Sequence, residues 1–136
     1  MKIEPYLFFN GRCEEAINFY REAVGASVTL IMRFSESPEP QKMPLPEGWE
    51  SKIMHAAFQI GGATIMASDG MTSEEAKFSG FSLSIAAADP DAAKRLFTGF
   101  SNGGAVLMPL EKTFWSPCFG MLMDRFGVRW MVSVSE

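Results

Sequence analysis

Hydrophobic and polar residues alternate along the chain with two different periods, one typical of helices and one typical of strands. Residues 13–24 carry apolar side chains at the spacing of an amphipathic helix, and Gly25 follows them as a stop signal. A second helix is predicted from Pro90, at the first helical position after Asp89, to about Phe100. The other apolar segments are short and largely alternate with period two, which predicts strands over residues 3–9, 28–34, 54–60, 63–68, 81–87, 106–108, 119–123 and 128–134.

The order of these elements occurs twice, as a strand, a helix and three further strands. The segment Ala16-x-x-Phe19-Tyr20 in the first helix corresponds to Ala93-x-x-Leu96-Phe97 in the second. This repeat predicts an α+β fold of two βαβββ modules, at about residues 1–69 and 78–136, within a single domain that spans 1–136. We expect the modules to form a curled eight-stranded mixed sheet around a cavity, with one helix packed outside each.

The two faces of the predicted strands differ in composition. Side chains at alternate positions of a strand point to opposite faces. One set is apolar almost throughout and is assigned to the core under the helices; it includes Phe58, Phe81, Leu83 and Trp130. The other set mixes apolar and hydrogen-bonding groups, among them His55, Gln59, Met66, Ser82, Ser84, Arg129 and Met131. This mixture suits a ligand cavity, and it would also suit an inner core or a contact between two copies.

Charge and segment length exclude several classes of partner. The 136 residues carry a net charge of −4 and contain no run of Lys and Arg, which argues against binding to nucleic acid or anionic membranes. The apolar segments are too short to span a bilayer, and residues 1–5 lack the apolar region of a signal peptide. A cytoplasmic location is therefore predicted.

Two cysteines and two tryptophans in loops are further candidates for function. Cys13 and Cys118 have no CxxC spacing and are expected to be free thiols, without an assigned role. Residues 35–50 form a predicted loop that contains Pro38, Pro40, Pro44 and Pro46 and ends near Trp49, while Trp115 follows Phe114 in a later loop. Aromatic residues in such loops either stack on planar ligands or anchor the loop.

A combination of short segments spreads over nearly the whole chain. It comprises residues 5–11 (PYLFFNG), 16–20 (AINFY), Met54-His55 and 65–69 (IMASD), and its most specific part runs from Phe119 to Val132. Together these segments resemble the vicinal oxygen chelate superfamily, which includes glyoxalase I, bleomycin-resistance proteins and extradiol dioxygenases. Within it they are most similar to the PhnB-like branch. The resemblance implies the fold that the repeat predicts.

The metal enzymes of that superfamily imply four ligands, one on each of four strands. Carried onto this chain, the positions fall near Pro5, Met66, Ser82 and Met131. None of these is a usual ligand of a divalent ion, and the chain has one histidine. A group made of Glu4, His55 and Asp69 is conceivable, although their strand positions do not obviously converge. Neither a metal nor a cofactor is predicted. Some relatives are labelled ubiquinone-precursor methyltransferases, but this chain has no glycine-rich loop between a strand and a helix for such a cofactor.

The sequence therefore predicts a metal-independent protein that sequesters or senses a small molecule, and the resemblance implies a homodimer. The expected ligand is aromatic or amphipathic with an anionic end, which Arg129 would bind while Trp115 stacks on the body. The candidate ligand-binding residues are His55, Gln59, Met66, Ser82, Trp115, Arg129 and Met131. The alternative is a glyoxalase-like enzyme of the lyase, isomerase or dioxygenase type, with a non-standard metal site or with His55 as base. A pure interaction protein would leave the mixed face unexplained.

Overall fold

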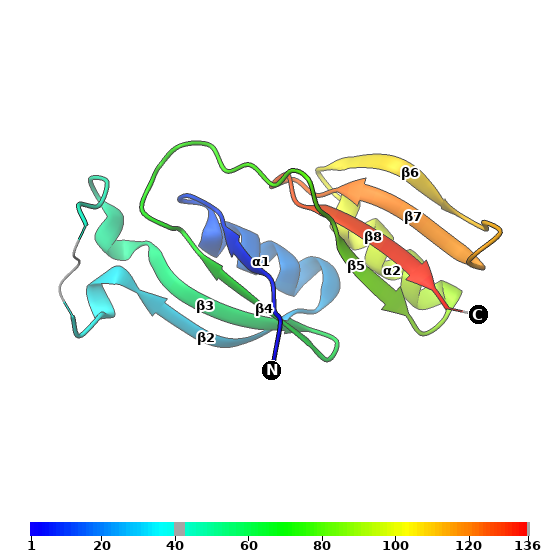
Figure 1. Ribbon diagram of the computed structural model, residues 1–136, viewed down its shortest axis with the longest axis horizontal. Helices are drawn as coiled ribbons and strands as arrows, with labels where there is room; N and C mark the ends of the chain where they lie inside the picture. Colours follow the sequence, from blue (N-terminus) through cyan, green and yellow to red (C-terminus); the bar gives the residue numbers. More distant parts are fainter. Residues whose placement is uncertain (40–42, 136) are drawn as a thin grey trace. The chain divides into compact units, whose positions relative to one another are not determined.

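The computed structural model describes residues 1–39 and 43–135, so Pro40 of the proline-rich loop lies outside the described residues. The chain divides into two compact units, Met1–Ala76 (unit 1) and Lys77–Glu136 (unit 2). Each unit contains a strand, a long helix and three further strands in this order (Figure 1). The α+β class and the two βαβββ modules predicted from the sequence are confirmed.

Unit 1 has one helix and a four-stranded mixed sheet. Its elements are β1 (Tyr6–Phe8), α1 (Cys13–Val24), β2 (Ser27–Arg33), β3 (Ile53–Ile60) and β4 (Ala63–Ser68). The strand order is β1-β4-β3-β2, with β1 parallel to β4 and the other pairs antiparallel. Helix α1 has the predicted bounds and ends at Gly25, whose φ of 71° is a left-handed conformation that suits glycine. Two 3-10 turns, Phe34–Glu36 and Trp49–Ser51, lie between β2 and β3.

Unit 2 repeats this arrangement. Its elements are β5 (Leu83–Ala87), α2 (Pro90–Ser101), β6 (Ala105–Glu111), β7 (Cys118–Met123) and β8 (Arg129–Val134). The order is β5-β8-β7-β6, with β5 parallel to β8, so the eight strands lie in two mixed sheets of four. The Asp89 carboxylate accepts the Ala92 N–H at 2.8 Å and caps α2. Among the described helices, none is long and apolar enough to cross a membrane.

Aromatic stacking joins the helix to the sheet in each unit. In unit 1, Tyr20 of α1 stacks on Phe58 of β3 with ring centroids 5.6 Å apart. In unit 2, Phe100 of α2 stacks on Trp130 of β8 at 4.1 Å. All four rings are buried, which confirms the assignment of Phe58 and Trp130 to the helix-packed cores.

The assignment of Phe81 to the core is wrong. Strand β5 begins at Leu83 rather than Phe81, and Phe81 is 45% exposed. Because Phe81 lies before the strand and after Gly80, which has φ 82°, the alternation of a regular strand does not fix the side to which it points. Strand β6 is longer than predicted and includes Pro109, which an edge strand tolerates because one of its sides needs no N–H donor.

Candidate functional site

The face of each sheet turned away from its helix, here called the helix-free face, carries most of the predicted site residues. In unit 1 the strand register places Tyr6 beside Met66, Met66 beside Ala57, and Ala57 beside Leu30. This row crosses all four strands, and His55 and Gln59 lie on the same face of β3 as Ala57. The structure thus brings three predicted residues, His55, Gln59 and Met66, onto one face.

A hydrogen-bonded aromatic pair lies at the β1 side of this face. The Tyr6 hydroxyl oxygen is 2.8 Å from His55 Nδ1, and the two rings stack with centroids 5.5 Å apart. Phe8, which is 52% exposed, also stacks on Tyr6, with ring centroids 5.0 Å apart. Since β4 lies between β1 and β3, the Tyr6 and His55 side chains meet across β4.

Partial burial raises the pKa of the Tyr6 hydroxyl above its usual value, and the nearby Ser68 hydroxyl opposes only part of that rise. The phenol therefore keeps its proton at neutral pH and is available as a hydrogen-bond donor. No metal ion is needed to hold the pair together, because the direct hydrogen bond and the ring contacts do so.

The other predicted residues of unit 1 lie around this pair. Met66 is half-buried in the middle of the face, next to Tyr6 in the register. Gln59 is exposed, four residues along β3 from His55, and its amide donates to Thr64 Oγ1 at 3.4 Å. Four residues of strand span roughly 13 Å, so a ligand on His55 would reach Gln59 only if it were elongated.

In unit 2 the helix-free face includes Arg129 and Met131. Met131 pairs with Met121 and Ser84, and Arg129 pairs with Met123. Arg129 is exposed. In the part of the chain that the structure describes, no carboxylate or other partner for this guanidinium is found.

Trp115 and Arg129 stand at opposite ends of the helix-free face of unit 2. Trp115 is 53% exposed and contacts Phe119 edge-on at 5.4 Å. Phe119 pairs with Ser133, whereas Arg129 pairs with Met123, four residues further along β7. The two candidates are therefore separated by roughly 13 Å of strand. Ser82, half-buried, precedes β5 by one residue and lies toward the Arg129 end of the register.

Trp49 anchors its loop. Its side chain is buried, and its Nε1–H donates to the Gly70 carbonyl at 2.7 Å. The ring also packs against Gly11, where a Cβ would lie 3.3 Å from it. Of the two roles considered for this residue, the structure supports the anchoring role.

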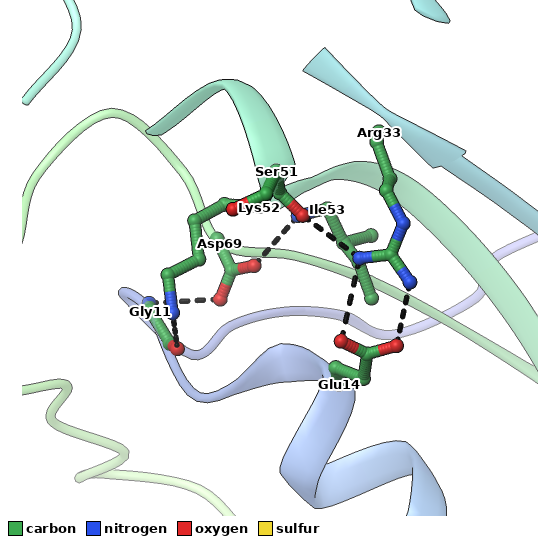
Figure 2. Close-up of a pocket in the computed structure, with 7 residues that line it drawn as sticks. All are labelled: Gly11, Glu14, Arg33, Ser51, Lys52, Ile53 and Asp69. Carbon is green, nitrogen blue, oxygen red and sulfur yellow. Dashed lines mark hydrogen bonds and ion pairs between the residues drawn. The ribbon is translucent and has the colours of Figure 1, made fainter. Parts of the chain in front are cut away.

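A pocket of about 180 Å³ lies in unit 1 where the end of β2, the 49–51 turn and the start of α1 meet (Figure 2). It is lined by Gly11, Glu14, Arg33, Ser51, Lys52, Ile53 and Asp69. The Arg33 guanidinium binds both Glu14 carboxylate oxygens, at 2.6 and 3.3 Å, and the Ser51 carbonyl at 2.8 Å. This hydrogen-bonded pair lowers the pKa of Glu14 and raises the pKa of Arg33.

Sequence reasoning considered Asp69 only as a conceivable metal ligand and missed its role in this pocket. Asp69 is 1% exposed, and its carboxylate accepts the N–H groups of Gly11 and Ile53 (Figure 2) and that of Cys13, each at 2.8 Å. The Lys52 ammonium donates to the Gly11 carbonyl at 2.9 Å. Because the polar groups of the pocket largely bind one another, we assign them to holding the loop between β2 and β3 against α1.

The buried thiol of Cys13 should be unreactive in the folded protein. Burial raises its pKa, and the nearby carboxylates of Asp69 and Glu14 raise it further, so the reactive thiolate is suppressed. Cys118 is only half-buried. At neutral pH we expect a chromogenic thiol reagent to modify Cys118 alone, and both cysteines after addition of denaturant. Rapid modification of Cys13 without denaturant would contradict this assignment. The Cys118→Ser variant leaves Cys13 as the reacting thiol and so measures its modification alone.

Comparison with known proteins identifies the family of the chain. A family model described as 3-demethylubiquinone-9 3-methyltransferase matches residues 1–133. The chain belongs to this PhnB-like family. The YjdN protein of Escherichia coli K12 is 36% identical over an alignment of 143 positions, which covers 98% of this chain and 95% of that protein.

Solved structures support the same placement of the PhnB-like chain. Protein PA1353 from Pseudomonas aeruginosa has a TM-score of 0.85 at 40% identity, covering 99% of this chain and 98% of that one. The PhnB protein from Bacillus cereus has a TM-score of 0.78 at 28% identity, covering 99% of this chain and 100% of that one. A glyoxalase/bleomycin resistance protein/dioxygenase superfamily member from Sphaerobacter thermophilus, at 16% identity, covers 99% and 98% with a TM-score of 0.59 and shows the shared fold. The predicted resemblance is confirmed.

The residues of this PhnB-like protein do not fit the superfamily's metal site. Of the four positions, Pro5 offers only a carbonyl, which accepts the Met66 N–H at 2.9 Å, and Met66 and Met131 offer thioethers. The alternative group fails as well, because the Asp69 oxygens bind backbone N–H groups and His55 Nδ1 faces Tyr6. Within residues 1–39 and 43–135, no three His, Cys, Asp or Glu side chains form a group that could hold an ion.

Proposed function

We propose that this PhnB-like protein binds a small molecule on the helix-free faces of its sheets, without a metal ion. The observation that carries the proposal is the surface around the Tyr6–His55 pair. Phe8 and Leu30 are exposed there and Met66 is half-exposed, while the polar groups named on this face are the Tyr6–His55 pair and, further along β3, the Gln59–Thr64 pair. An apolar face with few, placed polar groups is typical of a ligand site, and a plain solvent-facing sheet would carry more charge.

The proposed ligand has an aromatic or amphipathic body and an anionic end. The exposed Arg129 guanidinium supports the anionic end, because a planar fork of donors without a carboxylate partner among the described residues suits a carboxylate or phosphate. Trp115 supports an aromatic body. Since these two residues stand at opposite ends of their face, a ligand that uses both is elongated.

Methyl transfer, the activity in the family's description, is not part of this proposal. The two strand-to-helix connections, residues 9–12 and 88–89, contain one glycine between them. Gly61-Gly62 forms the β3–β4 hairpin, and Gly103-Gly104 lies between α2 and β6. Neither pair opens a helix in the manner of a loop that binds a nucleotide-like cofactor.

We also propose that the protein acts as a homodimer, as its superfamily resemblance implies. The edge strand β6 exposes three consecutive apolar side chains, Val106, Leu107 and Met108. An exposed apolar edge strand invites pairing with another chain, so a second copy would cover a surface that is otherwise prone to aggregate.

A second candidate function is an enzyme that uses His55 as a base. The 2.8 Å contact between Tyr6 and His55 Nδ1 favours it in the tautomer in which Nδ1–H is the donor, because the contact then orients the imidazole and leaves a free lone pair on Nε2. The two functions make different demands on His55, because a base needs a free lone pair on its outer ring nitrogen and a donor to a ligand needs the proton there.

Thermal-shift screening of paired compounds tests the first function. Elongated aromatic carboxylic acids should stabilise the protein more than their neutral amides. The shift in melting temperature caused by each compound should be the same before and after treatment of the protein with a chelator. Arg129→Met should remove most of the preference, which we expect to be at least tenfold in affinity for a charged hydrogen-bonded contact. Arg95→Met, which removes an exposed arginine of α2, is the matched control. Equal shifts for acids and amides, or an unchanged preference in Arg129→Met, would remove Arg129 from the site.

A further inference from the structure

The contact between Tyr6 and His55 determines which ring nitrogen of the histidine carries the proton. The hydroxyl oxygen and Nδ1 are 2.8 Å apart, so one of them donates to the other. Tyr6 is a protonated phenol at neutral pH, and a phenol O–H is a stronger donor than the N–H of a neutral imidazole, while an imidazole nitrogen is the stronger acceptor. The hydroxyl therefore donates and Nδ1 accepts.

A neutral imidazole has one donor nitrogen and one acceptor nitrogen. With Nδ1 as acceptor, the proton is on Nε2. The two ring nitrogens point in different directions, so Nε2 does not reach the same hydroxyl. His55 is only half-buried, and none of the residues in 1–39 and 43–135 hydrogen-bonds its Nε2.

We infer that His55 presents a fixed N–H donor at Nε2 to a ligand on the helix-free face of unit 1, and that Tyr6 is the positioning residue that holds this tautomer. The ligand must then supply an acceptor oxygen at this point, from a carboxylate, a phenolate or a carbonyl. The inference rests on the proposed function for its ligand but not for its tautomer. It also opposes the base function, since a base at Nε2 would need a free lone pair there.

The tautomer can be read in the ligand-free protein, because the chain contains a single histidine. A long-range proton–nitrogen correlation spectrum of uniformly ¹⁵N-labelled protein at neutral pH should show an unprotonated Nδ1 and a protonated Nε2. In Tyr6→Phe, which keeps the ring stack and loses the hydroxyl, the Nδ1 signal should move toward the average of both tautomers. Thr29→Val, which removes another hydroxyl from the same sheet, should leave the signals in place.

Two substitutions of His55 test the ligand contact. His55→Gln places an amide N–H near the position of Nε2, whereas His55→Asn places its amide near Nδ1. Aromatic compounds with an acceptor oxygen should bind wild-type protein about tenfold more tightly than isosteres without it, the effect of one hydrogen bond. This preference should survive in part in His55→Gln and disappear in His55→Asn.

The outcomes separate the inference from the proposed function. A protonated Nδ1 in the wild-type protein, or identical spectra for wild type and Tyr6→Phe, would overturn the tautomer and return His55 to the candidate bases. Equal losses in His55→Gln and His55→Asn would overturn the Nε2 contact. Failure of every compound to bind, with the expected spectra, would refute the proposed function and the ligand contact while leaving the positioning role of Tyr6 in place.

Discussion

Replacing Trp130 with alanine is expected to lower the free energy of unfolding by about 3–5 kcal/mol. The indole is 1% exposed and stacks on Phe100 of α2 with ring centroids 4.1 Å apart, so its removal leaves a cavity between helix and sheet. Its Nε1–H also donates to Asp124 Oδ2 at 2.9 Å, and the truncation leaves that buried carboxylate oxygen without this donor. Chemical denaturation of wild type and variant measures the difference.

Two control variants show which part of the loss comes from which contact. Trp130→Phe retains a ring against Phe100 and loses the N–H and part of the indole volume, so its effect should be smaller than that of the alanine variant. Ser84→Ala lies on the helix-free face of β5 and is exposed, so it should change stability by no more than about 0.5 kcal/mol. Similar losses for Trp130→Ala and Ser84→Ala would contradict the assignment of the two faces.

The elements and most core positions could be predicted because the signals for them are local. The bounds of α1 follow from apolar spacing and from Gly25, and the position of Trp130 in the core follows from alternation within one strand. The prediction failed for Phe81, which lies before β5, because alternation has no meaning outside a regular strand. The repeat of the element order then predicted the two modules.

The Tyr6–His55 pair could not be predicted, because it depends on strand order. The two residues are 49 positions apart and contact each other across β4, in a sheet ordered β1-β4-β3-β2. Alternation placed His55 on the correct face but could not tell which strand would lie two positions away. The same limitation applies to Trp115 and Arg129, whose separation along one face follows from the β7–β8 register.

Asp69 was likewise noted in the sequence only as part of a motif and as a conceivable ligand. Its actual partners are three backbone N–H groups from two separate places: Gly11 and Cys13 at the start of α1, and Ile53 at the start of β3. A buried carboxylate that accepts several N–H bonds is a signature of backbone organisation, because the buried amides of Cys13 and Ile53 would otherwise lack an acceptor. Nothing local in the sequence indicates which amides those are.

Replacing Asp69 with alanine is therefore expected to cost about 3–5 kcal/mol of unfolding free energy, since three amides lose a charged acceptor at once. Asp89→Ala is the matched control, because it removes an exposed aspartate that accepts one N–H at the start of α2 and should cost about 1 kcal/mol. Asp69→Asn keeps one acceptor oxygen and should fall between the two. Denaturant unfolding of the three variants measures this order. A loss in Asp69→Ala no larger than that in Asp89→Ala would mean that water or other groups accept these N–H bonds, and that Asp69 does not join α1 to β3.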